Sequence, residues 1–207
     1  FDGVSTIYEG SIALTGMLAD NTQLSLSGGV FDLSQVTGGT QTIASLSGTG
    51  GTLILGDIAL TINQTGTTSY AGDITGTGEL IIDGTGDLKL EGDISFSGDA
   101  LIESGTLSVN GSMTQADFFV SPAGTLGGNG TVGNVFVEGG TIAAGNSIGT
   151  LNVAGDLTLT SASVFEIEVN DAGGADLVNV SGTATLGGAT AAILAEAGTY
   201  DPYTEYT

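Results

Sequence analysis

The sequence predicts an all-β protein folded as a parallel β-solenoid, and three observations support this fold. A unit of glycine, a small polar or acidic residue and an aliphatic residue recurs along the 207 residues, as at 86–88 and 105–107. Leu88 and Leu107 in these units are 19 residues apart, about the length of one solenoid coil. Apolar and polar residues alternate after the glycines, which is the period of a β-strand.

Short strands are therefore expected directly after the glycines. The clearest alternation places Glu166 and Glu168 between Phe165, Ile167 and Val169, so that one side of a strand faces inward and the other faces water. Glycine makes up 37 of the 207 residues, and at this frequency it interrupts any helix before the helix can extend. Coils of about 20 residues would give about ten coils in this length.

The sequence leaves the secondary structure of one stretch undecided, and it favours the solenoid over two other all-β folds. The alanine-rich stretch 189–197 is compatible with a helix or a buried strand. Short strands with glycine turns also allow a sandwich or a barrel, but the 19-residue recurrence and the presence of only two prolines favour the solenoid. No linker divides the chain, so we expect one solenoid domain over 1–207.

The charge balance excludes several classes of partner. Twenty-three acidic residues stand against one basic residue, Lys89, and histidine is absent, which gives a formal net charge of −22. Nucleic acids and anionic membrane surfaces both require clustered Lys and Arg, so neither is expected as a partner. No run of 18 apolar residues occurs, so we expect no direct insertion into a membrane. Neither end of the chain has the character of a natural terminus, and we expect a piece of a longer protein.

Two glycine-rich motifs match sequences that are known for catalysis or cofactor binding. Residues 145–149 (Gly-Asn-Ser-Ile-Gly) fit the nucleophile elbow around Ser147, which needs a following helix and a histidine base. Residues 128–133 (Gly-Asn-Gly-Thr-Val-Gly) fit the dinucleotide fingerprint, which needs a strand–helix–strand unit. Neither context is present in the pattern, so we interpret both as solenoid turns and assign no catalytic and no cofactor-binding residues.

Paired carboxylates allow a second chemical interpretation, because two acids on one face serve polysaccharide cleavage. The candidate pairs are Glu166 with Glu168 and Asp83 with Asp87. The chain has no Trp or His to accompany them, so we interpret these acids as a solvated surface and expect no enzyme.

Calcium is the metal that this composition permits, because calcium takes carboxylate and carbonyl oxygens from turns. No window repeats the calcium-binding nonapeptide, so weak calcium binding stays open and no metal ligand is assigned. The acids that stand at glycine turns are Asp57, Asp73, Asp87, Asp93, Asp99 and Asp156.

Several segments together resemble the C-terminal passenger region of bacterial autotransporters, which use type V secretion. The likeness is most specific over 124–186, where it includes 128–135 (Gly-Asn-Gly-Thr-Val-Gly-Asn-Val) and 140–151 (Gly-Thr-Ile-Ala-Ala-Gly-Asn-Ser-Ile-Gly-Thr-Leu). Ala144 stands where the family commonly has proline, and the acidity exceeds what the family leads one to expect. Weaker similarity covers 29–33, 41–48, 96–102 and 105–107.

The resemblance implies a right-handed parallel β-helix on the bacterial cell surface, joined in the precursor to its own C-terminal outer-membrane β-barrel. The expected function is a non-enzymatic, secreted stalk, adhesin or self-association surface whose partner is a second copy or a host or surface ligand. We expect 124–186 to be the folding core, with the aliphatic-rich strands from Val132 to Val169, which include Leu151 and Phe165, as its nucleus. The alternatives are a calcium-dependent surface-layer or biofilm structural protein, and a β-helical polysaccharide-cleaving enzyme.

Overall fold

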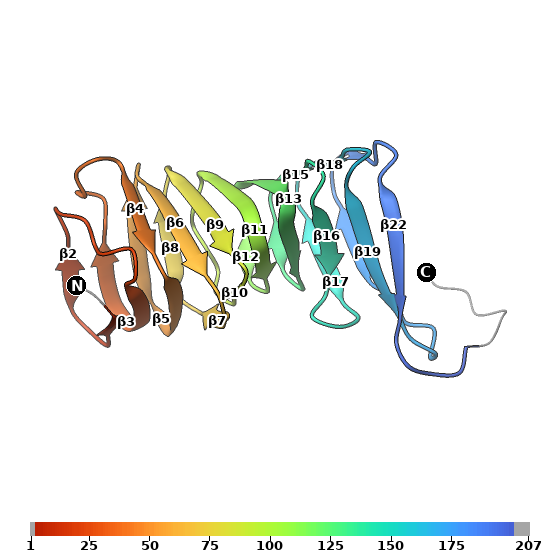
Figure 1. Ribbon diagram of the computed structural model, residues 1–207, viewed down its shortest axis with the longest axis horizontal. Coiled ribbons are helices and arrows are strands. Elements are labelled where there is room, and N and C mark those ends of the chain that lie inside the picture. The colour runs from red at the N-terminus through yellow and green to blue at the C-terminus, as the bar shows by residue number, and fades with distance from the viewer. Residues whose placement is uncertain (1–2, 201–207) are drawn as a thin grey trace.

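The computed structural model describes residues 3–200, which form 22 strands and no helix. Successive strands wind about one long axis, with the N-terminal strands at one end and β22 (Thr190–Ala195) at the other (Figure 1). Every pairing between named strands is parallel. The predicted parallel β-solenoid is confirmed, with about eight turns.

Each turn of the solenoid contributes to three flat faces, and strands of one face pair only with strands one coil away. Four long strands bend at a corner and contribute to two faces: β3, β5, β11 and β13. The first face consists of β1 (Val4–Ile7), β3 (Gln23–Asp32), β5 (Ser45–Gly56), β7 (Thr67–Tyr70), β10 (Asp87–Leu90), β11 (Asp99–Val109), β13 (Asp117–Gly128), β16 (Thr141–Ala144), β19 (Val164–Val169) and β22.

The second and third faces take the remaining strands in the same way. The second face consists of the ends of β3 and β5 with β2 (Ser11–Ala13), β8 (Asp73–Gly76), β12 (Ser112–Met113), β14 (Thr131–Val132), β17 (Thr150–Val153) and β20 (Leu177–Val180). The third face consists of the beginnings of β11 and β13 with β4 (Thr40–Ile43), β6 (Ala59–Gln64), β9 (Glu79–Gly84), β15 (Val135–Val137), β18 (Leu157–Leu159) and β21 (Ala184–Thr185).

Glycine permits the corners at which one strand passes from face to face. In β11 the register shifts between Ile102 and Ser104, and Gly105 follows with φ +72°. A Cβ atom on Gly105 would lie 2.6 Å from the carbonyl oxygen of Gly86 on the preceding coil. Both the positive φ and the close approach of two backbones require glycine here.

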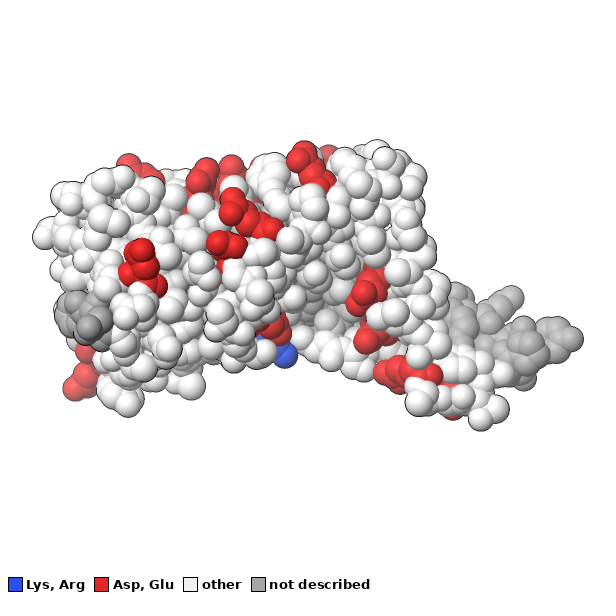
Figure 2. Space-filling model, in the orientation of Figure 1, with Lys and Arg blue, Asp and Glu red and all other residues white. Residues whose placement is uncertain are grey.

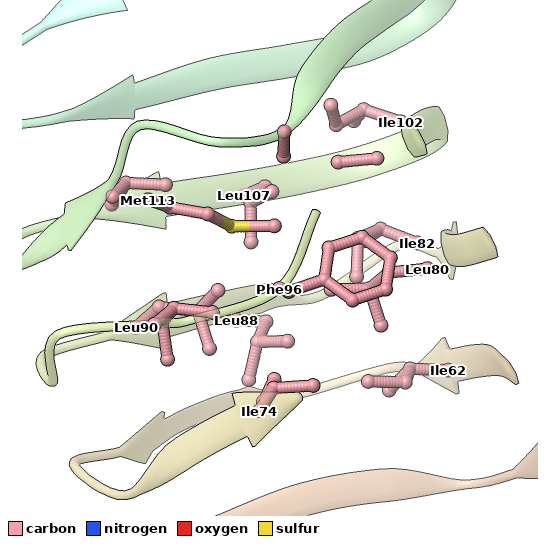
Figure 3. Close-up of a cluster of buried hydrophobic side chains, with 14 of the residues drawn as sticks. Ile62, Ile74, Leu80, Ile82, Leu88, Leu90, Phe96, Ile102, Leu107 and Met113 are labelled. Carbon is pink, nitrogen blue, oxygen red and sulfur yellow. The ribbon is translucent and has the colours of Figure 1, made fainter. Parts of the chain in front are cut away.

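The inward side chains stack in columns along the axis, so each coil buries its aliphatic residues against the next coil. Figure 3 shows this arrangement in the central coils, where Ile62, Ile82 and Ile102 follow one another and Leu88 lies below Leu107. Burial of one such side chain stabilises the fold by about 1.5–3 kcal/mol. The column of the third face continues over seven coils as Ile43, Ile62, Ile82, Ile102, Val120, Val137 and Leu159.

The few buried polar side chains all have partners among the described residues. Gln64 donates from Nε2 to the carbonyl oxygens of Gly66 and Asp87, at 2.8 and 2.5 Å. Tyr70 donates its hydroxyl to the carbonyl oxygen of Gly51 at 3.1 Å, and burial together with the nearby Asp73 raises its pKa far above the usual value. The bonds to Asp87 and to Gly51 each join two neighbouring coils.

Two details differ from the sequence expectation. The number of turns is lower than about ten, because coils near the C-terminus are long: Leu157 pairs with Ala184, whereas Leu88 in the central coils pairs with Leu107. The stretch 189–197 contains β22, which is a strand but is largely exposed rather than buried. Within residues 3–200 no helix has the length and hydropathy needed to cross a membrane.

Candidate functional site

Ser147, the serine of the elbow-like motif, lies in the loop that joins β16 to β17. Its hydroxyl donates to Glu196 Oε1 at 3.2 Å, and both side chains are exposed. The chain continues from this loop into strand β17, not into a helix. The strand–turn–helix geometry that activates a nucleophile is therefore not formed around Ser147.

The second glycine motif, 128–133, spans the end of β13, the corner that follows it and β14. A Cβ on Gly130 would overlap the carbonyl oxygen of Gly111 on the preceding coil. The backbone amide of Gly130 donates to the carbonyl oxygen of Val109 at 2.8 Å, so this segment bonds to its own fold. The glycines here permit close stacking of coils.

The two acids of the candidate pair, Asp83 and Asp87, have different hydrogen-bond partners in the structure. Asp83 accepts hydrogen bonds from the Ser104 hydroxyl at 2.7 Å and the Gly84 amide at 2.8 Å, and these bonds lower its pKa. Asp87 accepts from the Ser108 hydroxyl at 3.0 Å and lies 3.7 Å from the Lys89 ammonium group. Each carboxylate is thus bonded to the next coil of the solenoid.

Glu166 and Glu168 are partly exposed residues of β19, and further acids, Asp176 and Glu196, lie near Glu168. The pKa of Glu168 is raised by burial, and then by the negative charges of Asp176, Glu196 and Glu166. Asp176 itself is 8% exposed and accepts from the backbone amides of Gly149 at 2.9 Å and Glu168 at 2.8 Å. Sequence reasoning missed this carboxylate, which fastens its own loop to β19 and to the loop 145–149, and no local pattern indicates that these segments lie close together.

The acids at glycine turns are divided between two environments. Asp73 accepts from the Ser95 amide at 2.7 Å, and Asp156 accepts from the Thr183 amide at 2.7 Å, so both bind the coil that follows. Asp57 and Asp99 instead line an open polar cleft of about 420 Å³, which lies where the strands of the third face begin. In residues 3–200 no group of three His, Cys, Asp or Glu side chains is placed to hold a metal ion.

An apolar column on the outside of the third face is the surface feature that the sequence analysis did not identify. Ile81, Leu101, Phe119 and Phe136 occupy matching positions on four consecutive coils, and all four side chains are partly exposed. The rings of Phe119 and Phe136 stack with centroids 5.3 Å apart and planes 12° apart. We call these four residues the aromatic stripe.

The aromatic stripe differs from the corresponding columns on the other faces. The outward column of the first face includes Ser69, Lys89 and Ser108 in register. A signal for the stripe was present in the sequence, since adjacent Phe118 and Phe119 cannot both point inward from a strand. Phe136 follows Phe119 on the next coil, in direct register.

Carboxylates flank the aromatic stripe on both sides. Two residues before the stripe, Glu79, Asp99 and Asp117 stand in register on three coils. The first two of these also line the polar cleft. Two residues after the stripe stand Asp83, Glu103 and, two coils further on, Glu138. Figure 2 shows that acidic side chains extend along the visible side of the rod with one basic group among them.

The described residues thus form a parallel β-solenoid with open, solvent-exposed faces, and this fold can be set beside the comparisons with known proteins. No family model matches the chain. One curated relative, an extracellular serine protease of Serratia marcescens, is 35% identical over 111 residues, which are 53% of this chain and 10% of the relative. A second extracellular serine protease of the same organism is 32% identical over 110 residues, which are 52% of this chain and 10% of that relative.

Together, the β-solenoid and these partial relatives fit an autotransporter passenger region. The names of the relatives agree with the expected location at the bacterial cell surface or outside the cell. The match covers about a tenth of each relative, so it does not carry over the activity of the whole protein.

The expectation that this protein is not an enzyme is contradicted by the relatives, since both are named serine proteases. That expectation came from residue types missing in these 207 positions, above all histidine. The matched stretch is a small part of each relative, and residues elsewhere in a longer chain can supply a catalytic base. Composition of one segment was therefore the wrong basis for excluding an enzyme.

Proposed function

We propose that this chain is the β-solenoid passenger region of a longer autotransporter-type protein and supports an extracellular serine protease activity. The observation that carries the proposal is the continuous parallel stack of coils, from β1 to β22, in which each coil pairs with the next. Such a rod holds an attached unit away from its anchor, because every coil is fixed by its neighbours. The two partial relatives supply the protease class.

In this proposal the catalytic histidine lies outside the 207 residues, because a Ser-His-Asp site needs a histidine base and this segment has none. The 207 residues act as a folded rod that holds the protease unit in position and exposes a surface of its own to binding partners. That surface gives the passenger a second role as an adhesive stalk.

We further propose that 1–207 acts as one solenoid domain and that folding begins within 124–186, next to the C-terminal outer-membrane barrel of the precursor. Leu151 is fully buried within this region, and Phe165 packs against the same core. Coil-by-coil growth from such a nucleus would let a passenger fold outside the cell as it emerges.

The test is secretion of the full precursor from a Gram-negative bacterium, with Leu151→Asp or Phe165→Asp as the variants. An unpaired carboxylate at the fully buried Leu151 is strongly unfavourable and one at the partly buried Phe165 less so, so we expect most of the protease-resistant passenger at the cell surface to be lost with Leu151→Asp and a smaller part with Phe165→Asp. Thr158→Asp is the matched control, because Thr158 points outward from β18 in the same region. A fluorophosphonate label reports the serine protease separately.

The two readouts address different parts of the proposal. Normal surface passenger in the Leu151→Asp precursor would contradict the folding role of 124–186. A full precursor that reaches the surface but takes up no fluorophosphonate would contradict the protease role. Loss of surface passenger in the Thr158→Asp control would show that the assay does not distinguish buried from exposed positions.

A further inference from the structure

We propose that the aromatic stripe with its flanking carboxylates is a docking surface for a basic amphipathic helix of a partner polypeptide. The inference does not depend on the protease proposal, since it concerns only the outer side of the third face. Three features carry it: the apolar column, the two acidic borders and the distance between those borders.

The apolar column supplies the contact area. Ile81, Leu101, Phe119 and Phe136 stand on consecutive coils in the register of the sheet, so the stripe runs along the solenoid axis. Coils in a sheet are about 4.8 Å apart, which makes the stripe about 14 Å long, or nearly three turns of an α-helix. Thr61 and Thr158 continue the column at its two ends, so its apolar part is bounded.

The acidic borders supply charge complementarity. Glu79, Asp99 and Asp117 lie in register on adjacent coils, so their negative charges repel one another. Basic side chains along one edge of a partner helix would relieve this repulsion. The polar cleft that Glu79 and Asp99 line, about 420 Å³ in volume, has room for the end of a Lys or Arg side chain.

The distance between the two acidic borders matches the width of an α-helix. Each border lies two residues from the stripe, and two residues of strand extend about 6.7 Å, so the borders are about 13 Å apart. An α-helix with its side chains is about 10–12 Å wide. A helix lying along the stripe would therefore place its apolar side on the phenylalanines and its lateral Lys or Arg residues over both borders.

Other occupants fit this surface less well. A second copy of this chain brings 23 acids and one basic residue, so two such faces repel. A metal ion lacks a suitable group of three ligands in residues 3–200. A sugar would stack on free aromatic faces, whereas Phe119 and Phe136 cover one face of each other.

The experiment measures binding of a labelled synthetic helical peptide, with leucine and phenylalanine on one side and lysine along both flanks, by fluorescence anisotropy. Two double variants of the chain remove one feature each: Phe119→Ser with Phe136→Ser, and Glu79→Gln with Asp99→Asn. We expect each to weaken binding about tenfold, and only the acidic variant to reduce the salt dependence.

The matched control is Glu9→Gln with Glu91→Gln, which removes two exposed charges away from the third face and should leave affinity within about twofold. A peptide of the same composition, scrambled so that no apolar side forms, should bind about tenfold more weakly. If the phenylalanine variant loses its β circular dichroism, Glu103→Gln with Glu138→Gln tests the same surface through its second border.

Three results would overturn the proposal. The first is equal weakening by the control variant and by the acidic variant, which would indicate general attraction to a charged rod. The second is unchanged affinity in all variants of the third face. The third is a dimer of the free chain in sedimentation that Phe119→Ser with Phe136→Ser abolishes, which would make a second copy the occupant.

Discussion

The central and C-terminal coils share one strand pattern but differ in how they pack. In the central coils Asp87 pairs with Thr106, and the inward leucines Leu88 and Leu107 are fully buried. In the C-terminal coils Val164 pairs with Thr190, so more of the chain is used for one turn. Large apolar side chains are exposed there, including Leu177 at 49%.

Corner length explains the longer coils, whereas Leu177 and Leu186 are exposed because β20 and β21 pair with no later coil among residues 3–200. The loops 145–149 and 170–176 add residues that do not contribute to the inward columns. An apolar cavity of about 210 Å³ lies among Ile142, Phe165 and Leu186. Polar bonds hold these loops instead, as when Asn170 Oδ1 accepts from the Gly174 amide at 2.9 Å. The long corners are thus held by partly buried hydrogen bonds, whereas the short central coils are held by fully buried leucines.

The expected folding core, 124–186, includes both tightly packed coils and part of the more exposed C-terminal coils. Leu126 and Leu151 within 124–186 are fully buried, whereas Leu177 and Leu186 in the same range are exposed. The family-like sequence is therefore not the most tightly packed part of the described chain. Whether folding begins there remains a prediction for the secretion experiment.

The largest expected effect is the loss of a central core side chain. Leu107→Ala leaves a cavity that rigid neighbouring coils cannot fill, so the free energy of unfolding should fall by about 3 kcal/mol. Val178→Ala, beside the existing C-terminal cavity, should cost about 1 kcal/mol. Urea unfolding of the two variants measures the difference, and equal losses would show that the packing contrast has no energetic consequence.

A smaller, local effect is expected from Asp176→Ala. The variant leaves the partly buried amides of Gly149 and Glu168 without their acceptor, which should cost about 2 kcal/mol in the C-terminal coils. Hydrogen exchange should increase in both loops while the central coils stay protected. Glu138→Ala, which removes an exposed acid outside both loops, is the control, and equal exchange in both variants would contradict a clamping role for Asp176.

The smallest expected effect is on how the melting temperature depends on pH. Glu168 in the C-terminal coils and Asp83 in the central coils should change it in opposite directions. The pKa of Glu168 is raised from 4.5, so its contribution is complete below that pH and is lost as the pH rises through the folded-state value. Glu168→Gln should therefore melt above the wild type at neutral pH and match it in acid. The same Tm under all conditions would contradict the shift.

Asp83 provides the central counterpart to this measurement. Its pKa is lowered from 3.8 by the Ser104 hydroxyl and the Gly84 amide, so its contribution is present above that pH and lost as the pH falls. Asp83→Asn should melt below the wild type at neutral pH, with the difference vanishing in acid. Both carboxylates are partly exposed and so are screened by solvent, which should keep both shifts in Tm small.

The strand pattern could be predicted because it is local. Alternating residues such as Leu88, Lys89 and Leu90 define an inward side, and recurrent glycines define corners, so parallel coils follow without any knowledge of contacts. The candidate surface could not be predicted as readily, because Phe119 and Phe136 become neighbours only when the coils are in register.

By itself, the sequence determined the strands, the glycine corners, the aliphatic core and the large negative charge, since each depends on residues close together in the chain. Only the tertiary structure decided which coils are long, where Asp176 binds and which outward residues form the aromatic stripe. These features depend on register between coils, and register is set by the summed conformations of the corners and by packing between one coil and the next.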